Sequence, residues 1–287
     1  MTLTDHRFDV NLSMLFTELP LLERPSAAAA AGFTAIEFWW PFTTAVPTDT
    51  EVDAFARAIT DAGVQLVGLN FFAGDMPGGD RGLVSWPARR GEFRDNIDVT
   101  VGLGTQLGCT AFNALYGNRV EGSTPAEQDA LAAENIALAA AAAAKVDATI
   151  LVEPVSGAPR YPLRTAAEVV DVLDRVRREA GATNVQMLCD LYHLDANGDD
   201  VAAAIATHAG RIGHVQIADN PGRHEPGTGN LDLNTHLESL RHAGYDGYIG
   251  LEYKPATTTL DSFDWLPREQ RASSTTPTQT NPLRRTS

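Results

Sequence analysis

The feature that most constrains the fold of this sequence is a regular alternation of short apolar runs with helical segments. The apolar runs are residues 8–15, 34–40, 64–71, 109–115, 148–153, 184–190, 213–219 and 248–253. Helical patterns separate them at residues 20–31, 50–62, 92–107, 125–145, 165–180, 199–208 and 232–242. Strands that alternate with helices at this spacing form a parallel sheet. Eight such units predict a closed (β/α)₈ TIM barrel rather than an open sheet.

Length and composition fit one folded body. The chain has 287 residues, of which 44% are hydrophobic, and this is enough to fill the core of a single barrel. We therefore predict one catalytic domain over residues 1–267. From Arg268 to Ser287 the sequence is rich in Ser, Thr, Gln and Pro and has one large aliphatic residue. That composition predicts a flexible C-terminal tail.

The charge and the remaining sequence signals exclude several classes of partner. A formal net charge of −15 disfavours binding to nucleic acid or to anionic membranes. No uninterrupted apolar run reaches the length of a membrane span, and the N-terminus does not resemble a secretory signal. Cys109 and Cys189 lie in apolar runs, so we expect buried, reduced thiols. These features indicate a cytoplasmic protein with a small-molecule partner. They are compatible with a homo-oligomer.

The last four apolar runs each contain a polar residue at or near the carboxyl end. These residues are Glu153, Asp190, Gln216 and Glu252, about one strand–helix unit apart. In a (β/α)₈ barrel, the carboxyl ends of the strands meet at the active site. Three carboxylates and one amide suit a hard divalent cation, Mg²⁺ or Mn²⁺. No GxGxxG pattern follows the first run, so we expect no nucleotide cofactor.

Several segments of the chain resemble the hydroxypyruvate isomerase family of the xylose-isomerase-like TIM barrels. They are NLSMLF (11–16), GFTAIEFWWP (32–41), LVEP (151–154), CDLYH (189–193), HVQIADNPGRHEPGTG (214–229) and GYDGYIGLEYKP (244–255). The segment at 214–229 is highly specific, whereas the ending LEYKP is shared more widely with sugar epimerases. Related ketose 3-epimerases place His where this chain has Gln216, which favours the hydroxypyruvate isomerase branch.

The resemblance implies both a metal site and an acid/base pair. Glu153, Asp190, Gln216 and Glu252 would bind the cation, and Glu153 and Glu252 would also transfer protons. Converting hydroxypyruvate to tartronate semialdehyde requires loss of a proton next to a carbonyl. A divalent cation stabilises the resulting enediolate, while one carboxylate removes the proton and another returns one. This chemistry needs no redox cofactor.

Further polar residues are candidates for substrate binding. His193 follows the sixth run and is expected to hydrogen-bond a substrate oxygen. Arg223 suits a substrate carboxylate, because guanidinium binds carboxylates in a bidentate way. His224 and Glu225 share its loop, and we expect them to position the substrate or their neighbours. Asn70 ends the third run and is expected at the mouth of the barrel.

Two other polar residues lie within apolar runs. Glu37, near the end of the second run, is expected to add a hydrogen bond at the mouth. His214 begins the seventh run, at the end away from the cation ligands, and a packing role is the stronger interpretation for it.

Two alternatives stay open. The protein could be an isomerase or epimerase of the same superfamily whose substrate is a 2-oxo-tetronate or a ketose. These enzymes share the same proton chemistry, and the loops around the pocket determine which substrate binds. A barrel that only binds a metal or a sugar acid is a different class. The presence of both Glu153 and Glu252 argues against it, since binding alone needs no pair of proton carriers.

Overall fold

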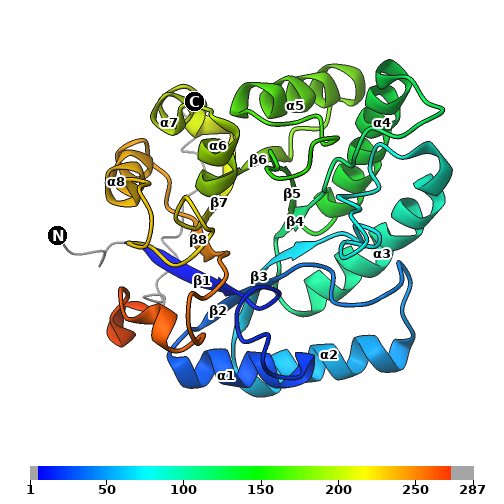
Figure 1. Ribbon diagram of the computed structural model, residues 1–287. Coiled ribbons are helices and arrows are strands. Elements are labelled where there is room, and N and C mark those ends of the chain that lie inside the picture. Colours follow the sequence, from blue (N-terminus) through cyan, green and yellow to red (C-terminus); the bar gives the residue numbers. More distant parts are fainter. Residues whose placement is uncertain (1–5, 273–287) are drawn as a thin grey trace, which may run out of the picture.

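A computed structural model describes residues 6–272, and within them eight parallel strands close into a barrel (Figure 1). The strands are β1 (Arg7–Asn11), β2 (Ala35–Phe38), β3 (Gln65–Asn70), β4 (Ala111–Asn113), β5 (Thr149–Val152), β6 (Val185–Asp190), β7 (Ile212–Ile217) and β8 (Tyr248–Leu251). Each strand pairs with the next in sequence, and β8 pairs with β1 to close the ring. The prediction of a (β/α)₈ barrel is confirmed.

Helices surround the barrel on its outside (Figure 1). They are α1 (Arg24–Ala31), α2 (Asp49–Ala62), α3 (Arg90–Gln106), α4 (Pro125–Ala144), α5 (Ala166–Ala180), α6 (Leu191–Asn197), α7 (Val201–His208) and α8 (Leu233–His242). Short 3₁₀ helices occur at Leu21–Glu23, Pro87–Arg89, Ala209–Arg211, Asp261–Phe263 and Arg268–Gln270. The sequence did not predict α6, which follows β6 without a linker. No helix in residues 6–272 is both long and apolar enough to span a bilayer.

Local sequence explains where the helices begin and end. Thr48, Thr124 and Thr165 each accept a hydrogen bond from the third residue of the following helix, and a glutamate there bonds back to the threonine. These capping boxes satisfy backbone N–H groups that the first turn leaves free. Gly63 and Gly181 end α2 and α5 with positive φ, which glycine adopts without steric cost. The helix boundaries read from these residues are therefore close to those observed.

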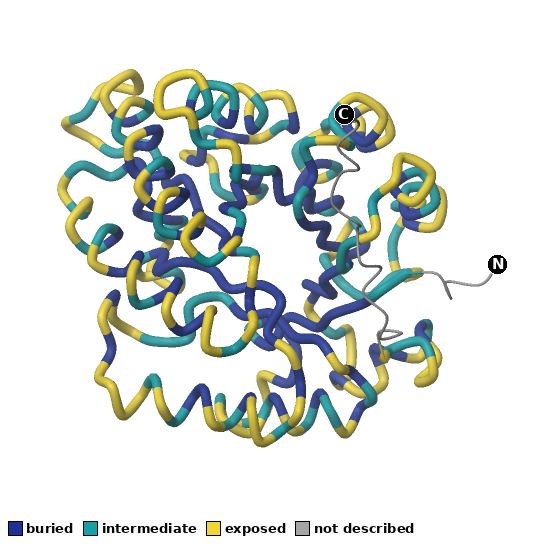
Figure 2. Tube along the Cα trace, turned by 180° about the vertical axis from the view of Figure 1, so that it is seen from behind, coloured by how far each residue is buried: buried dark blue, intermediate teal, exposed yellow. Residues whose placement is uncertain are grey.

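The core lies inside the barrel and between the barrel and the helices. Figure 2 shows buried residues along the strands and exposed residues on the outer sides of the helices. Helix α3 approaches β4 closely at Gly104, where a Cβ would lie 2.3 Å from Cε1 of Phe112. Cys109 and Cys189 are buried and unpaired, as predicted.

The predicted start of the tail needs a correction. Arg268 begins a 3₁₀ helix, and its Nη1 donates to the carbonyl of Ala30 at 2.6 Å. Arg271 donates to the carbonyl of Ala31 at 3.0 Å. These guanidinium groups satisfy backbone acceptors at the end of α1, so the folded body continues beyond residue 267. The rest of the predicted tail, from residue 273 on, lies outside the described residues.

Candidate active site

The strands bring the four predicted cation ligands to one end of the barrel. Asp190 ends β6 and pairs in register with Gln216 on β7, which in turn pairs with Gly250 on β8. Glu153 and Glu252 directly follow β5 and β8. All four side chains are buried, with at most 5% of each residue exposed. Four oxygen-bearing side chains therefore share one buried end of the barrel.

Glu153 is held from β4. The Nδ2 of Asn113 donates to Glu153 Oε1 at 2.6 Å. Burial, together with the nearby charge of Asp190, raises the pKa of Glu153 to about 8. A glutamate whose pKa lies near neutrality can both accept and donate a proton under physiological conditions.

Asp190 is both the end of β6 and the N-cap of α6. Its Oδ1 accepts a hydrogen bond from the backbone N–H of His193 at 3.0 Å. This cap explains why a helix starts directly at the strand end. Burial raises the pKa of Asp190 to about 6, although the charge of Arg223 opposes this shift.

His193 has a defined tautomer. The backbone N–H of Ser156 donates to its Nδ1 at 3.0 Å, and the Ser156 hydroxyl lies 2.7 Å from the same atom. Because Nδ1 accepts, the proton of the neutral ring is on Nε2, which lies 3.6 Å from Asp190 Oδ2. Burial lowers the pKa of His193 well below its ordinary value. The ring is therefore a neutral donor that lines the cavity.

Arg223 is placed between acidic groups. Its Nη2 donates to Glu252 Oε1 and lies 3.9 Å from Asp190 Oδ2. The guanidinium carbon lies 5.3 Å from the centre of the Tyr192 ring. Asp219 fixes the loop, because its carboxylate accepts backbone hydrogen bonds on both sides of Arg223. This cation compensates carboxylates whose burial would otherwise be costly.

Glu252 also has a partner on β1. The Nδ2 of Asn11 donates to Glu252 Oε2 at 3.0 Å. Burial raises the pKa of Glu252 well above its ordinary value, and the charge of Arg223 opposes the shift. Like Glu153, Glu252 therefore binds a proton more readily than an exposed glutamate does.

The donor set fits a divalent cation. Gln216 donates its Nε2 to Glu37 Oε1 at 2.7 Å, and its Oε1 is buried without a hydrogen-bond partner among the described residues. A buried carbonyl oxygen without a partner is costly unless a ligand or water satisfies it. Glu153, Asp190 and His193 offer possible ligand atoms that all lie within 4.8 Å of one another. The carboxylate oxygens of Glu153, Asp190 and Glu252 at this end of the barrel are donors of the hard kind that Mg²⁺ and Mn²⁺ prefer.

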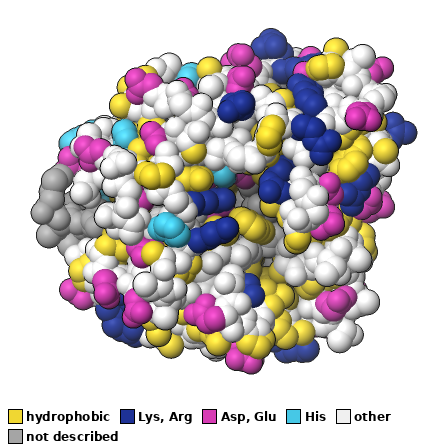
Figure 3. All heavy atoms as spheres, in the orientation of Figure 1, with side chains coloured by type: hydrophobic (Ala, Val, Ile, Leu, Met, Phe, Trp, Pro, Cys, Tyr) yellow, Lys and Arg dark blue, Asp and Glu magenta, His cyan; other side chains and the backbone are white. Residues whose placement is uncertain are grey.

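A cavity of 470 Å³ opens over these groups. Its walls include Asn70, Arg81, Glu153, His193, Arg223, Glu252 and Lys254. Figure 3 shows a hollow on this face with basic and apolar side chains at its rim. Although the whole chain is acidic, three cationic side chains line the cavity. These cations lie beside the two glutamates of the wall and offer partners for a small anion.

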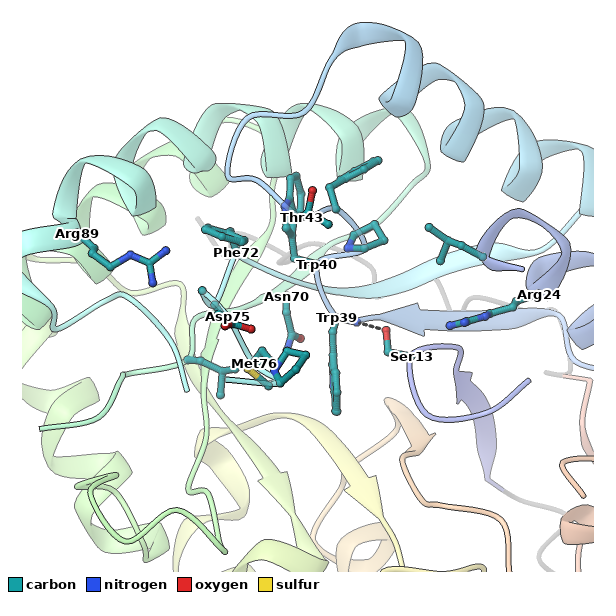
Figure 4. A pocket seen from close by; sticks show the side chains of 17 residues that line it. Ser13, Arg24, Trp39, Trp40, Thr43, Asn70, Phe72, Asp75, Met76 and Arg89 are labelled. Atoms are coloured by element: carbon teal, nitrogen blue, oxygen red, sulfur yellow. Dashed lines mark hydrogen bonds between the residues drawn. The ribbon is translucent and has the colours of Figure 1, made fainter. Parts of the chain in front are cut away.

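A second cavity of 560 Å³ adjoins the first. The two share Trp39, Asn70, Met76, Pro77 and Leu115. Figure 4 shows Trp39, Asn70 and Met76 in this second space, with Arg24 and Arg89 at its two sides. Trp40 and Phe42, which follow β2, add aromatic walls. The site therefore extends from the carboxylates across the ends of β2 and β3.

Not every predicted substrate-binding residue lies at the cavity. Asn70, His193 and Arg223 line it, whereas His224 and Glu225 are absent from its walls. The Nδ1 of His224 lies 2.7 Å from the backbone oxygen of Lys254, and Glu225 accepts the backbone N–H of Ala256 at 3.0 Å. These two side chains tie the loop after β7 to the loop after β8. They connect these two loops and do not line the cavity.

The sequence analysis missed several residues of the site. Asn11 ends β1 and Asn113 ends β4, so the rule that identified the last four strand ends would have identified them too. Arg81 and Ser156 lie in loops and carry no local signal of their position. His214 is buried, and its Nε2 lies 2.8 Å from Glu37 Oε2, so its side chain has a polar partner inside the barrel.

Comparisons with known proteins agree with this geometry. A family model described as "Xylose isomerase-like TIM barrel" matches residues 25–269. The chain belongs to this family. A crystal structure described as AP endonuclease, family 2, from Brucella melitensis has 34% identity to this xylose isomerase-like barrel and a TM-score of 0.82. The match covers 91% of this chain and 97% of that one.

The curated relatives are named as isomerases. A putative hydroxypyruvate isomerase of Streptomyces coelicolor is 57% identical, over 95% of this chain and 99% of that protein. Hydroxypyruvate isomerase of Escherichia coli is 32% identical, over 91% and 98%. A 2-oxo-tetronate isomerase of Cupriavidus necator is 36% identical, over 91% and 97%. This xylose isomerase-like barrel is therefore an isomerase.

Proposed function

We propose that this isomerase interconverts hydroxypyruvate and tartronate semialdehyde with the help of a divalent cation. The observation that carries the proposal is the pair of buried glutamates, Glu153 and Glu252, in the wall of one cavity that also contains three cationic side chains. An enzyme that moves a proton on a small hydroxy-keto acid needs both features: proton carriers and a site for a carboxylate. Relatives named hydroxypyruvate isomerase support the same substrate.

The cation would be held by Glu153, Asp190, Gln216 and Glu252. A bound divalent cation supplies Lewis acidity, which stabilises the negative charge of an enediolate. The unpartnered Oε1 of Gln216 and the all-oxygen donor set support Mg²⁺ or Mn²⁺. His193 is a poorer ligand because Ser156 occupies its Nδ1 and its Nε2 carries the proton.

The two glutamates would carry the protons. One removes a proton from carbon 3 of hydroxypyruvate, and the other delivers a proton to carbon 2. The hydroxyl proton of carbon 3 moves to the oxygen of carbon 2, so the product is an aldehyde at carbon 3 and an alcohol at carbon 2. No atom or electron pair leaves the substrate. The Nε2–H of His193 is placed to donate to a substrate oxygen during this exchange.

Arg223 would bind the substrate carboxylate. It lines the cavity, and two further cations, Arg81 and Lys254, lie in the same wall. We expect Arg223→Ala to raise KM for hydroxypyruvate by about 10–100-fold, the effect of losing a hydrogen bond to a charged group. The KM for a neutral ketose should rise less. Steady-state kinetics with both substrates tests this, and an equal rise for both would contradict carboxylate recognition.

The size of the site favours one alternative substrate. The cavity over the glutamates falls in the range that holds drug-sized ligands, roughly 300–1,000 Å³, and it adjoins a second cavity of 560 Å³. A three-carbon acid leaves space there that a four-carbon 2-oxo-tetronate would use. The relative named 2-oxo-tetronate isomerase supports this second candidate.

A comparison of kcat/KM separates the two candidates. Purified protein loaded with Mn²⁺ is assayed with hydroxypyruvate, with 2-oxo-tetronates and with a neutral ketose. The proposal predicts the highest kcat/KM for hydroxypyruvate. A higher kcat/KM for the four-carbon acid would identify the 2-oxo-tetronate as the substrate. Turnover of the ketose alone would overturn both candidate substrates.

A further inference from the structure

Glu37, on β2, is held by side chains from two other strands inside the barrel. It is 3% exposed and accepts three side-chain hydrogen bonds. Its Oε1 accepts from Asn11 Nδ2 at 3.0 Å and from Gln216 Nε2 at 2.7 Å. Its Oε2 lies 2.8 Å from His214 Nε2. Two of these partners lead directly to the proposed cation ligands.

We infer that Glu37 is a positioning residue that holds Gln216 and, through Asn11, Glu252 in the orientation that binds the divalent cation. This inference rests on the proposed function, because it assumes that Gln216 and Glu252 are ligands. Glu37 itself would not touch the cation or the substrate.

Glu37 sets the orientation of the Gln216 amide. A carboxamide has an oxygen that accepts and a nitrogen that donates, and rotation about its last bond exchanges them. The acceptor Glu37 Oε1 selects the orientation in which Nε2 faces it. Oε1 must then face the opposite way, where it is buried without a partner among the described residues. Glu37 therefore presents the ligand oxygen of Gln216.

Asn11 connects Glu37 to Glu252. The two hydrogens of its Nδ2 bridge Glu37 Oε1 and Glu252 Oε2, each at 3.0 Å. Its Oδ1 accepts the backbone N–H of Ser13 at 2.9 Å, which prevents the amide from turning over. Glu37 thus fixes one carboxylate oxygen of Glu252 through a single intervening side chain.

The barrel interior leaves space for the carboxylate of Glu37. A Cβ on Gly250 would lie 2.7 Å from Glu37 Oε1 and 3.0 Å from Gln216 Cγ. A Cβ on Gly68 would lie 3.1 Å from Glu37 Oε2. Neither glycine has a positive φ, so their value here is the close approach of a side chain and not backbone freedom. Glycines on β3 and β8 therefore leave space for the Glu37 side chain.

Asp9, on β1, provides a matched comparison in the same interior. It is fully buried and lies 3.9 Å from His214 Nε2, the atom that contacts Glu37. Its two carboxylate oxygens have no hydrogen-bond partner among the described residues. Asp9 is therefore buried like Glu37, but among the described residues no hydrogen bond joins it to a proposed cation ligand.

The test measures Mn²⁺ affinity directly. Full-length protein is freed of metal by a chelator, the chelator is removed, and the protein is titrated with Mn²⁺. The free ion is followed by its electron paramagnetic resonance signal. We expect Glu37→Leu to weaken binding by about 10–100-fold, the effect typical of residues that orient metal ligands. Glu37→Gln should retain most of the affinity, because its amide oxygen still accepts from Gln216 and Asn11. Asp9→Asn should leave the affinity unchanged.

A second variant, Gln216→Glu, tests whether Glu37 acts by orienting the amide of Gln216 or only by stabilising the barrel interior. In Gln216→Glu protein the ligand is a carboxylate, which presents an oxygen on both sides and needs no orientation. Adding Glu37→Leu to this variant should therefore weaken Mn²⁺ binding less than it does in wild-type protein, because only the contact with Glu252 through Asn11 is left to lose. Equal weakening in both backgrounds, or a Glu37→Leu affinity within about threefold of wild type, would overturn the inference.

Two controls complete the experiment. Thermal unfolding checks that each variant folds, and Asn11→Ser, which removes the bridge to Glu252, replaces Glu37→Leu if that variant does not fold. Unchanged Mn²⁺ affinity in Asn11→Ser would then overturn the inference. Wild-type protein that binds no Mn²⁺ would instead overturn the cation site of the proposed function, and the inference with it. The wild-type titration thus separates the two failures.

Discussion

Glu153 and Glu252 approach the cavity from different strands, and each has a fixed partner. Asn113 holds Glu153, while Asn11 and Arg223 hold Glu252. We expect Glu153→Gln and Glu252→Gln each to lower kcat by about 10²–10⁴-fold, because an amide cannot transfer the proton. Glu225→Gln, in a loop outside the cavity wall, should keep near-normal kcat. Normal turnover in either glutamine variant, with the fold checked by circular dichroism, would remove that residue from the reaction.

The protonation of Glu153 should be visible in the stability of the cation-free protein. Its pKa rises from 4.5 to about 8 on folding, so between these values the folded state holds a proton that the unfolded state releases. Stability therefore falls as pH rises through this window, and Asp190, whose pKa is raised to about 6, adds to the trend. Urea unfolding of chelated protein from pH 5 to pH 8 measures the slope. Glu153→Gln should make the slope shallower, and an unchanged slope would contradict the assignment.

At the scale of single elements, the close contact of α3 with β4 makes a sharp prediction. A Cβ at Gly104 would meet Phe112 at 2.3 Å, whereas a Cβ at Gly102, two residues earlier in the same helix, would meet nothing within 4 Å. We expect Gly104→Ala to destabilise the protein by about 1–3 kcal/mol through overpacking. Gly102→Ala should stabilise it by up to about 1 kcal/mol, since alanine is the better helix former. Equal denaturation midpoints for the two variants would show that α3 does not pack there as described.

The elements also show what the sequence could predict. Strands ending at Asp190 or just before Glu153 were predictable because an apolar run stops at a polar residue. Helix α6 was not, because Asp190 both ends a strand and caps the helix that follows it. The positions of His224 and Glu225 depend on contacts with the loop after β8, some 30 residues away in the chain. Glu37 was expected at the mouth, but its hydrogen bond with Gln216 joins β2 to β7, two strands that are not neighbours and that barrel closure brings together.

At the scale of the whole molecule, the cation should link activity to stability. A ligand that binds only the folded state stabilises it by about 2.7 kcal/mol at 100 times its Kd. We therefore expect chelation to abolish turnover and to lower the melting temperature, and Mg²⁺ or Mn²⁺ to restore both. Chelated protein that turns over normally would exclude a catalytic cation. Differential scanning calorimetry and an activity assay on the same samples provide the comparison.

The central claim is that one buried carboxyl group removes a proton from carbon 3 of hydroxypyruvate and a second one delivers a proton, exchangeable with solvent, to carbon 2. Proton and deuterium NMR of the Mn²⁺- or Mg²⁺-loaded enzyme with hydroxypyruvate in D₂O tests it most directly, with Mg²⁺ preferred because it does not broaden the signals. The account predicts tartronate semialdehyde that carries solvent deuterium at carbon 2, and no such product from Glu153→Gln or Glu252→Gln protein. Hydroxypyruvate left unchanged by the loaded enzyme, or labelled product formed equally well by both variants, would contradict it.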